Sequence, residues 1–402
     1  MEKLEEQIRL EIMNEIDLSY DVSDEDILQL IKEKIIAKSK LVPVSLSQRQ
    51  QIENHVFNSL RKLDVLEDLL ADEEITEIMI NGPDNIFIEK AGKVIHSNER
   101  FSSEEKLNDV IQSIVANTNK IVNESNPIVD TRLEDGSRVN IVLKPAAVDY
   151  SILSIRKFPK EQMTMDRLKS FGAIDNEQIK FLQRLVESGY NIFVSGGTGS
   201  GKTSFLNALG EFIPKDQRVI TIEDAAELQL KNVDNLVRME ARSANLEGKN
   251  EITIRDLLKS SLRMRPDRII VGECRGAEAL EMLQAFNTGH DGSLSTGHSN
   301  SCKDMLSRLE TMVLMGAEIP LPAIRQQIAS GIDIIVQLGR LRDKSRKLIE
   351  ISEVDGVVDG EIKLNQLYCF KEICEENGRI IGQWEKVGDL IHTEKLKASG
   401  KI

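Results

Sequence analysis

Residues 196–203 read Gly-Gly-Thr-Gly-Ser-Gly-Lys-Thr, and this stretch decides the fold of the larger part of the chain. The apolar run before it, residues 190–195, is typical of a buried parallel strand, and residues 204–209 are typical of a helix start. Glycines let the backbone curl so that successive N–H groups point at one place, and the helix N-terminus adds partial positive charge. This order of strand, glycine-rich turn and helix predicts a phosphate-binding loop.

The phosphate-binding loop follows the pattern G-x-x-x-x-G-K-T, in which the last two positions have specific tasks. Lys202 is expected to reach the β- and γ-phosphates of a nucleotide, and the Thr203 hydroxyl is expected to ligate Mg²⁺. The alternative is a turn that only joins a strand to a helix, which is much rarer where both elements flank the pattern. The sequence therefore predicts binding of a nucleoside triphosphate. The residues expected to contact it are Gly196, Gly197, Thr198, Gly199, Ser200, Gly201, Lys202, Thr203 and Ser204.

The composition restricts the classes of function that are open to the chain. A net charge of -14 over 402 residues argues against a nucleic-acid carrier, although a local basic patch is compatible with it. The four cysteines contain no C-x-x-C pair, which argues against a zinc framework or a disulfide scaffold and fits a reducing cytosol. No apolar run approaches the ~20 residues that span a bilayer, and the charged first residues do not resemble a signal peptide. We therefore expect a cytoplasmic protein.

The character of the sequence changes twice along the chain and predicts three parts. Residues 1–65 are charged, with helical apolar spacing broken at Pro43, and are expected to form a helical N-terminal arm. Residues 66–158 are expected to form a small α+β domain. Residues 159–402 alternate strands with helices up to about residue 340, as in a doubly wound parallel sheet. The predicted elements of the middle part are strands at residues 75–80, 85–89, 136–143 and 151–156 and a helix at residues 107–117.

The tail, from about residue 345 to 402, is predicted to form small β pieces that pack on the α/β domain. Apolar residues alternate in its first part, as in a strand. Turns are expected at Asp355-Gly356 and at Asp359-Gly360.

Two apolar runs that follow the phosphate-binding loop in the sequence end in carboxylates. Residues 267–272 read as a buried strand that ends in Glu273, the position of a Walker B acid close to Mg²⁺. Residues 218–222 read as another buried strand, which delivers Glu223, Asp224 and then Glu227. A carboxylate there could deprotonate the attacking water. The alternatives are a surface acid at a strand end and a solvated acidic turn, and two such strands in one domain weigh against them.

Residues 288–299 form a polar, glycine-rich segment that holds His290 and His298. A single histidine is more often a buried structural group, but two of them in such a loop favour a functional role. They are too few for a metal site, because no cysteine or third histidine stands at ligand spacing. A sensor that donates a hydrogen bond to the γ-phosphate is the simpler role.

These blocks resemble, in their order, the motifs of the secretion ATPase superfamily, which covers type II and type IV secretion, type IV pili and archaeal surface filaments. Its Walker A, Asp box, atypical Walker B and His box match residues 196–203, 221–228, 271–276 and 288–299. The segments 282–293 and 308–315 look most like the CpaF-type ATPase of tight-adherence (Tad/Flp) pilus systems. The likeness spans about residues 65–370 and does not cover the charged arm.

The resemblance implies a role for each motif residue. Glu223 would be the general base for water, with Glu227 nearby. Glu273 would be the Walker B acid that holds the water shell of Mg²⁺ together with Thr203, and His298 would be the γ-phosphate sensor. In this superfamily the small N-terminal domain supplies arginines to the nucleotide, which nominates Arg138 and Arg156, with Arg132 as a weaker candidate. The alternative is that these arginines are surface strand ends.

The resemblance also implies an architecture and partners. The α+β domain would be PAS-like and the α/β domain RecA-like, and the subunits would close into a ring, expected to be a hexamer. ATP hydrolysis with Mg²⁺ would open and close the two domains and push on an integral inner-membrane platform protein, so that the motor sits peripherally on the inner face of the cell membrane. The missing C-x-x-C module favours the tight-adherence or conjugation-like branch. A DNA-translocating motor and a non-hydrolysing nucleotide switch stay as alternatives.

Overall fold

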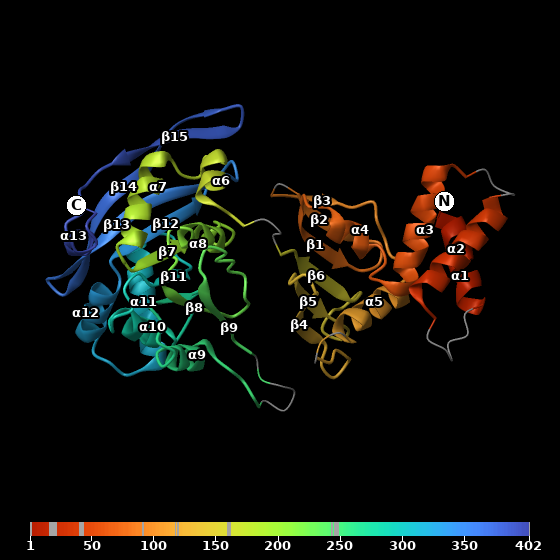
Figure 1. The fold of residues 1–402 in the computed structure, drawn as a ribbon, viewed down its shortest axis with the longest axis horizontal. Helices are drawn as coiled ribbons and strands as arrows, with labels where there is room; N and C mark the ends of the chain where they lie inside the picture. Colours follow the sequence, from red (N-terminus) through yellow and green to blue (C-terminus); the bar gives the residue numbers. More distant parts are fainter. Residues whose placement is uncertain are drawn as a thin grey trace. The chain divides into compact units, whose positions relative to one another are not determined.

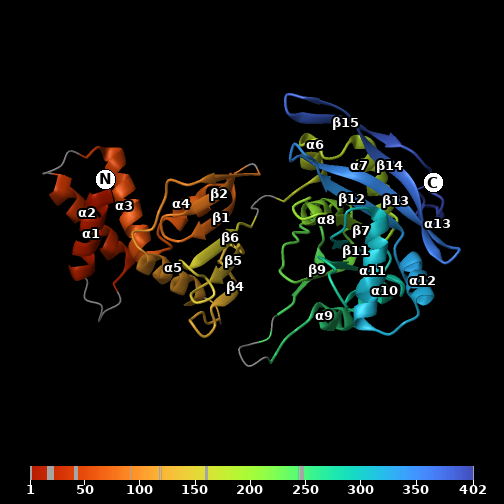
Figure 2. The same ribbon diagram turned by 180° about the vertical axis from the view of Figure 1, so that it is seen from behind.

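The computed structural model describes residues 2–15, 22–39, 44–90, 92–116, 118, 120–158, 162–242, 244 and 249–401. The chain divides into two compact units, Met1–Lys160 and Glu161–Ile402. Figures 1 and 2 show the helices and strands of both units from opposite sides. Within the described residues, no helix combines the length and the apolar character needed to cross a bilayer.

Three helices begin the first unit and share a small apolar core. They are α1 (Glu2–Glu15), α2 (Asp24–Ser39) and α3 (Leu46–Arg61). Their buried residues recur every three or four positions, which places them on one face of each helix: Ile8, Ile12, Ile27, Ile31, Ile35, Ile52 and Val56. The predicted helical spacing is thereby confirmed, while the break expected at Pro43 lies outside the described residues.

The rest of the first unit is built on an antiparallel sheet of six strands in the order β3-β2-β1-β6-β5-β4. Helix α5 buries its apolar face in the core of this sheet. The four predicted strands are confirmed, and the predicted helix begins earlier, at Glu104; its expected end at Asn117 lies outside the described residues. The elements are α4 (Leu66–Ala71), β1 (Ile75–Asn81), β2 (Ile86–Lys90), β3 (Lys93–His96), α5 (Glu104–Ala116), β4 (Ile128–Arg132), β5 (Arg138–Val142) and β6 (Ile152–Arg156).

A nine-stranded sheet in the order β15-β14-β13-β12-β7-β11-β10-β8-β9 forms the centre of the second unit. From β12 to β9 neighbouring strands are parallel, and β13, β14 and β15 continue the sheet in antiparallel pairing. Its helices are α6 (Met165–Ser170), α7 (Asn176–Glu187), α8 (Lys202–Gly210), α9 (Ile254–Ser261), α10 (Ala279–Phe286), α11 (Cys302–Gly316), α12 (Leu321–Gly331) and α13 (Glu394–Ala398). Its strands are β7 (Ile192–Gly196), β8 (Arg218–Glu223), β9 (Asn235–Glu240), β10 (Arg268–Val271), β11 (Leu294–Gly297), β12 (Ile334–Arg340), β13 (Arg346–Val358), β14 (Glu361–Glu376) and β15 (Arg379–Lys386).

Helices cover both faces of the parallel strands, which confirms the predicted doubly wound arrangement. Helices α6, α7 and α8 pack on one face and α9, α10, α11 and α12 on the other, as the two views show (Figures 1 and 2). Because side chains alternate along a strand, Ile192 and Val194 of β7 enter the first core and Phe193 enters the second. Buried on both faces, these strands read as continuous apolar runs in the sequence.

The structure corrects the predicted tail. Its β structure is not a set of small pieces but three long strands, β13, β14 and β15, that extend the main sheet. The turn expected at Asp355-Gly356 is wrong, because the pair lies inside β13 at a register shift where Gly356 has φ of 105°. A glycine with positive φ makes a β-bulge there without reversing the chain. The turn expected at Asp359-Gly360 is confirmed, since it joins β13 to β14.

The parallel strands end together at one edge of the sheet. Ser195 of β7 lies opposite Gly297 of β11, and Ile222 of β8 lies opposite Val271 of β10. In open parallel sheets the carboxyl ends of the strands are where ligands bind. The topology therefore brings to one edge the segments that follow β7, β8, β10 and β11.

Candidate nucleotide-binding site

The loop between β7 and α8 has the geometry of a phosphate cradle. Gly199 and Gly201 have φ of 70° and 92°, a region that glycine enters without strain. Gly201 is the N-cap of α8 and gives no side-chain hydrogen bond, so the first N–H groups of the helix are left for an anion. A Cβ on Gly196 would lie 2.7 Å from the Leu338 carbonyl oxygen and 2.5 Å from Ser200 Oγ, so only glycine fits at the strand end.

Lys202 lies folded into the loop that it belongs to. Its side chain is buried, and Nζ donates to the carbonyl oxygens of Gly196 at 3.0 Å and Gly197 at 3.1 Å. Nζ also lies 3.2 Å from Nδ1 of His298, which follows β11. The structure thus brings together the predicted phosphate-binding lysine and the predicted sensor histidine.

His298 connects Lys202 to the predicted Walker B acid. Its Nε2 lies 2.7 Å from Glu273 Oε1. Because a lysine ammonium has only donors, Nδ1 accepts from Lys202, and Nε2 of the neutral ring carries the proton and faces the Glu273 carboxylate. Burial, against the attraction of Glu273, lowers the pKa of His298 and favours this neutral ring.

Glu223 is the most buried carboxylate of the site, with 3% of its surface exposed at the end of β8. Its Oε2 accepts from the backbone N–H groups of Glu227 at 2.8 Å and Leu228 at 3.0 Å. Its Oε1 is buried and has no hydrogen-bond partner among the described residues. Burial raises the pKa of Glu223 to about 7, although the two N–H groups favour the charged form. Glu223 is therefore poised to take a proton near neutral pH.

Arg275 is a residue of the site that sequence reasoning missed. Its guanidinium pairs with Glu273 Oε2 at 2.7 Å and with Asp224 Oδ2 at 3.3 Å, so it joins the segments after β10 and β8. Its proximity to Glu273 in the sequence gave no sign of the contact with Asp224, which depends on β10 lying beside β8. Another missed contact is Thr296 Oγ1, which donates to the Gly272 carbonyl oxygen at 2.7 Å and ties β11 to this segment.

The predicted magnesium residues come from two different segments of the second unit. Thr203 is in the first turn of α8, and Glu273 follows β10. No set of three or more His, Cys, Asp or Glu side chains that could hold a metal by itself occurs in the described part of the chain. This donor set fits Mg²⁺ that arrives with a nucleotide, because such an ion takes one or two protein oxygens and completes its shell with phosphate oxygens and water. Ser204, which is predicted to contact the nucleotide, follows Thr203 in the first turn of α8.

His290, the other histidine of the predicted His box, contacts none of these residues through its Nδ1, which lies 3.0 Å from the Ala285 carbonyl oxygen.

The arginines predicted to reach the nucleotide lie side by side in the first unit. Arg138 of β5 is directly opposite Arg132 of β4 on one side and Arg156 of β6 on the other. Arg156 is 62% exposed and lies 3.6 Å from Glu77. The sheet register therefore lines up the three guanidinium-bearing side chains across neighbouring strands, and their delivery to a nucleotide stays a prediction.

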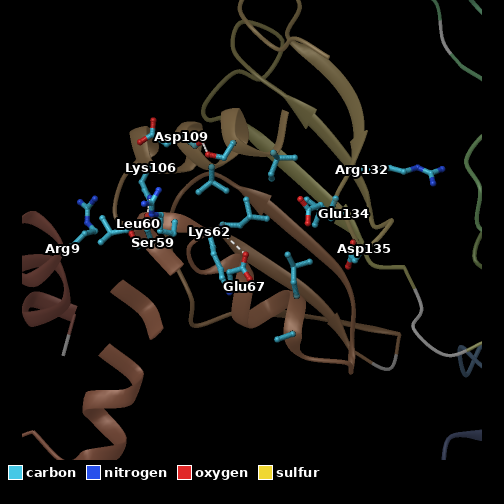
Figure 3. Close-up of a pocket in the computed structure, with 18 of the residues that line it drawn as sticks. Arg9, Ser59, Leu60, Lys62, Glu67, Lys106, Asp109, Arg132, Glu134 and Asp135 are labelled. Carbon is cyan, nitrogen blue, oxygen red and sulfur yellow. Dashed lines mark hydrogen bonds between the residues drawn. The ribbon is translucent and has the colours of Figure 1, made fainter. Parts of the chain in front are cut away.

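A cleft of about 990 Å³ in the first unit is a separate feature (Figure 3). Its charged walls come from α1, the end of α3, α4, α5 and the end of β4, as the labelled side chains show. Arg9 pairs within α1 with Glu6, and Lys106 Nζ donates to the Ser59 carbonyl oxygen at 2.5 Å. None of the phosphate-loop residues lines it, so the candidate site is the loop of the second unit and not this cleft.

The chain is similar to proteins of bacterial secretion and conjugation. The family described as "Type II/IV secretion system protein" matches residues 59–380. A Mycobacterium tuberculosis protein named for conjugal transfer is 33% identical over 72% of this chain and 83% of its own. The type IV secretion system protein VirB11 of Brucella suis is 32% identical over 69% of this chain and 84% of its own.

A solved structure agrees at the level of the fold. The match with the structure of the Legionella pneumophila ATPase DotB covers 71% of this chain and 78% of the DotB chain, with a TM-score of 0.52 and 22% sequence identity. This likeness supports a RecA-like α/β fold for the phosphate-loop unit. With the family matching most of the chain, including every motif of the candidate site, the protein belongs to the type II/IV secretion system protein family.

Proposed function

We propose that this chain is a Mg²⁺-dependent ATPase that powers a secretion or pilus-assembly machine. The observation that carries the proposal is the meeting of four predicted groups at one sheet edge: Lys202, His298, Glu273 and Glu223. A phosphate cradle alone would support binding. A buried carboxyl with a pKa of about 7 beside a Walker B acid supports hydrolysis as well.

The chemistry follows from where each side chain lies. Lys202 would leave the carbonyl oxygens of its own loop for the phosphates, because a phosphate offers the ammonium a charged partner. Glu223 would take the proton of the attacking water with its free Oε1. Mg²⁺ would neutralise phosphate charge, with Thr203 and the water held by Glu273 on the protein side. His298 would exchange its bond to Lys202 for one to the γ-phosphate, and Arg138 and Arg156 would complete the neutralisation.

The proposed assembly is a homo-hexameric ring in the cytoplasm. It would work on an integral inner-membrane platform protein and would touch the membrane only through that partner. Opening and closing of the two units around the nucleotide would supply the stroke. Support comes from the family to which the chain belongs and from relatives named for type IV secretion.

Within this class we place the chain in Tad/Flp-type pilus assembly. The support is the resemblance of residues 282–293 and 308–315 to CpaF-type ATPases and the missing C-x-x-C pair. A second candidate, a conjugation-type secretion ATPase, is favoured by the relative named for conjugal transfer. The net charge of -14 argues against direct handling of DNA.

The test is phosphate release from ATP with Mg²⁺ on size-separated oligomers. Wild type is compared with Glu223→Gln and Lys202→Ala. Glu223→Gln is expected to bind ATP and to lose about 10²- to 10⁴-fold in turnover, the usual contribution of a general base. Lys202→Ala is expected to lose binding, and Glu227→Gln is the matched control for charge.

Each outcome separates the candidates. Wild-type turnover that Glu223→Gln retains would reject Glu223 as the base and leave Glu273 as the next candidate. Binding without turnover at any oligomer size would support a nucleotide switch. Turnover stimulated by DNA would favour the conjugation-type reading, and loss of surface pili on deletion in the native host would favour the Tad/Flp reading.

A further inference from the structure

A β-hairpin lies beside the phosphate loop, on the other side of β7 from the strands that carry Glu223 and Glu273. Strand β12 pairs with β7, and Leu338 lies directly opposite Gly196, where the loop begins. The hairpin of β12 and β13 extends past this point, and its last strand pair is Arg340 with Arg346. Two arginines therefore stand opposite each other beside the phosphate loop.

The turn that holds these arginines is anchored. The Leu341 and Lys344 backbone N–H groups close it, donating to Ser345 and Leu341 carbonyl oxygens at 2.8 Å and 2.9 Å. Asp343 accepts from the backbone N–H of Ile380 in β15 at 2.8 Å. Arg342 pairs with Glu372 of β14 and, at 2.9 Å, with Glu375. The hairpin is thus a fixed platform and not a loose loop.

The two arginines contact or approach the glycines of the phosphate loop. Arg346 Nε donates to the Gly199 carbonyl oxygen at 2.8 Å, and its Cδ lies 3.5 Å from where a Cβ on Gly201 would be. Arg340 Nη1 lies 3.9 Å from where a Cβ on Gly199 would be. One bond to a loop carbonyl leaves the Nη groups of Arg346 available.

The charges of these arginines are not used elsewhere. Both side chains are exposed, and neither forms an ion pair with any acid in the part of the chain that the structure describes. The neighbouring cationic side chains already have partners. Arg342 pairs with Glu372 and Glu375, and Lys347 donates to the Gly172 carbonyl oxygen. In a chain of net charge -14, two guanidinium groups without an ion pair beside a phosphate loop are best explained as groups that bind an anion.

We propose that Arg340 and Arg346 bind a phosphate group of the nucleotide that the loop holds, an inference that rests on the proposed function. The planar fork of a guanidinium matches phosphate oxygens and forms charge-assisted bonds with them. The hairpin then forms a wall of the site within the same unit as the phosphate loop. The arginines of the first unit would be an addition to this wall and not a substitute for it.

The experiment measures binding of ATP and of inorganic tripolyphosphate, both with Mg²⁺, by calorimetry on the full chain. The variants are Arg340→Ala, Arg346→Ala and Arg346→Lys. Each alanine variant is expected to bind both ligands about tenfold more weakly, the effect of one charge-assisted hydrogen bond. Arg346→Lys is expected to recover part of the loss, because it keeps the charge without the fork. Lys344→Asn, which removes one charge from the same turn at a residue with φ of 67°, is expected to bind like wild type.

The outcomes distinguish this inference from the proposed function. ATP binding that Lys202→Ala abolishes but both alanine variants retain would overturn the inference and leave the ATPase proposal standing. Weaker ATP binding with unchanged tripolyphosphate binding would also overturn it, since the arginines would then contact the base or the ribose. Wild type that binds neither ligand would overturn both proposals. Equal thermal unfolding midpoints across the variants verify that each one is folded.

Discussion

His298 Nε2 lies 2.7 Å from Glu273 Oε1, so the segments predicted as the His box and the Walker B motif are in direct contact. The contact exists because β11 and β10 are parallel neighbours, and the segments that follow them leave the sheet at the same edge. The other ring nitrogen of His298 meets Lys202. One imidazole therefore connects three motifs that are far apart in the sequence.

Replacing His298 is expected to separate binding from turnover. His298→Ala should keep ATP binding within about threefold, because Lys202 and the loop N–H groups remain, and should lower turnover about 10²-fold or more, as loss of a preorganised donor does. Binding and phosphate release measured on the same samples check this. His290→Ala is the control from the same segment, since His290 bonds to Ala285 and not to a motif residue. Turnover unchanged in His298→Ala would reject the sensor role.

The rate of hydrolysis is expected to rise with pH through neutrality. Glu223 acts as a base only when it is ionised, and burial raises its pKa to about 7. The turnover of wild type should therefore increase about tenfold per pH unit below 7 and level off above it. Glu223→Gln should show a low rate without this step. A wild-type profile that is flat between pH 5.5 and about 8 would show that Glu223 does not titrate in the rate-limiting step.

The same carboxyl predicts how stability depends on pH. The pKa is raised in the folded state from 4.5 to about 7, so the folded protein loses stability as pH rises through this interval. This difference in pKa corresponds to a change of about 3 kcal/mol in the free energy of unfolding. Glu223→Gln removes the titrating group, and its stability relative to wild type should grow by about this amount between pH 4.5 and 7.5.

Urea unfolding at several pH values, followed by circular dichroism, measures this difference. Glu227→Gln is the matched control, because Glu227 stands four residues on and outside the strand. Its stability should follow that of wild type across the same range. A Glu223→Gln variant that tracks wild type at every pH would mean that the carboxyl is hydrated and not buried.

The sequence predicts most of the residues that gather at the candidate site because each of them has a local signal. The glycine-rich turn after an apolar run identifies Lys202, and acids after two other apolar runs identify Glu223 and Glu273. Parallel strands end at a common edge, so a parallel sheet brings these residues toward one another. The predicted residues that lie together in the structure are thus those that depend on local pattern and on one rule of topology.

The contacts that sequence reasoning missed depend on which strands are neighbours. Arg275 reaches Asp224 because β10 lies beside β8. Arg346 of β13 reaches Gly199 because β13 pairs with β12, which lies beside β7. Periodicity along a strand does not contain the order of strands across the sheet. The tail was mispredicted for a related reason, since Gly356 has the same local signal in a bulge as in a turn.

Arg275 is expected to act on nucleotide affinity through Glu273. Its guanidinium neutralises Glu273 at 2.7 Å, and without it the carboxylate would repel the phosphates that Lys202 attracts. Arg275→Ala should therefore raise the KM for ATP about tenfold with a smaller change in kcat. The tenfold change corresponds to a loss of about 1.4 kcal/mol in the free energy of ATP binding. The side chain is 58% exposed, so the free energy of unfolding should change by less than about 0.5 kcal/mol. Arg275→Lys, which keeps the charge, should retain most of the affinity. Equal KM values for the alanine and lysine variants would show that the charge of Arg275 does not act on the nucleotide.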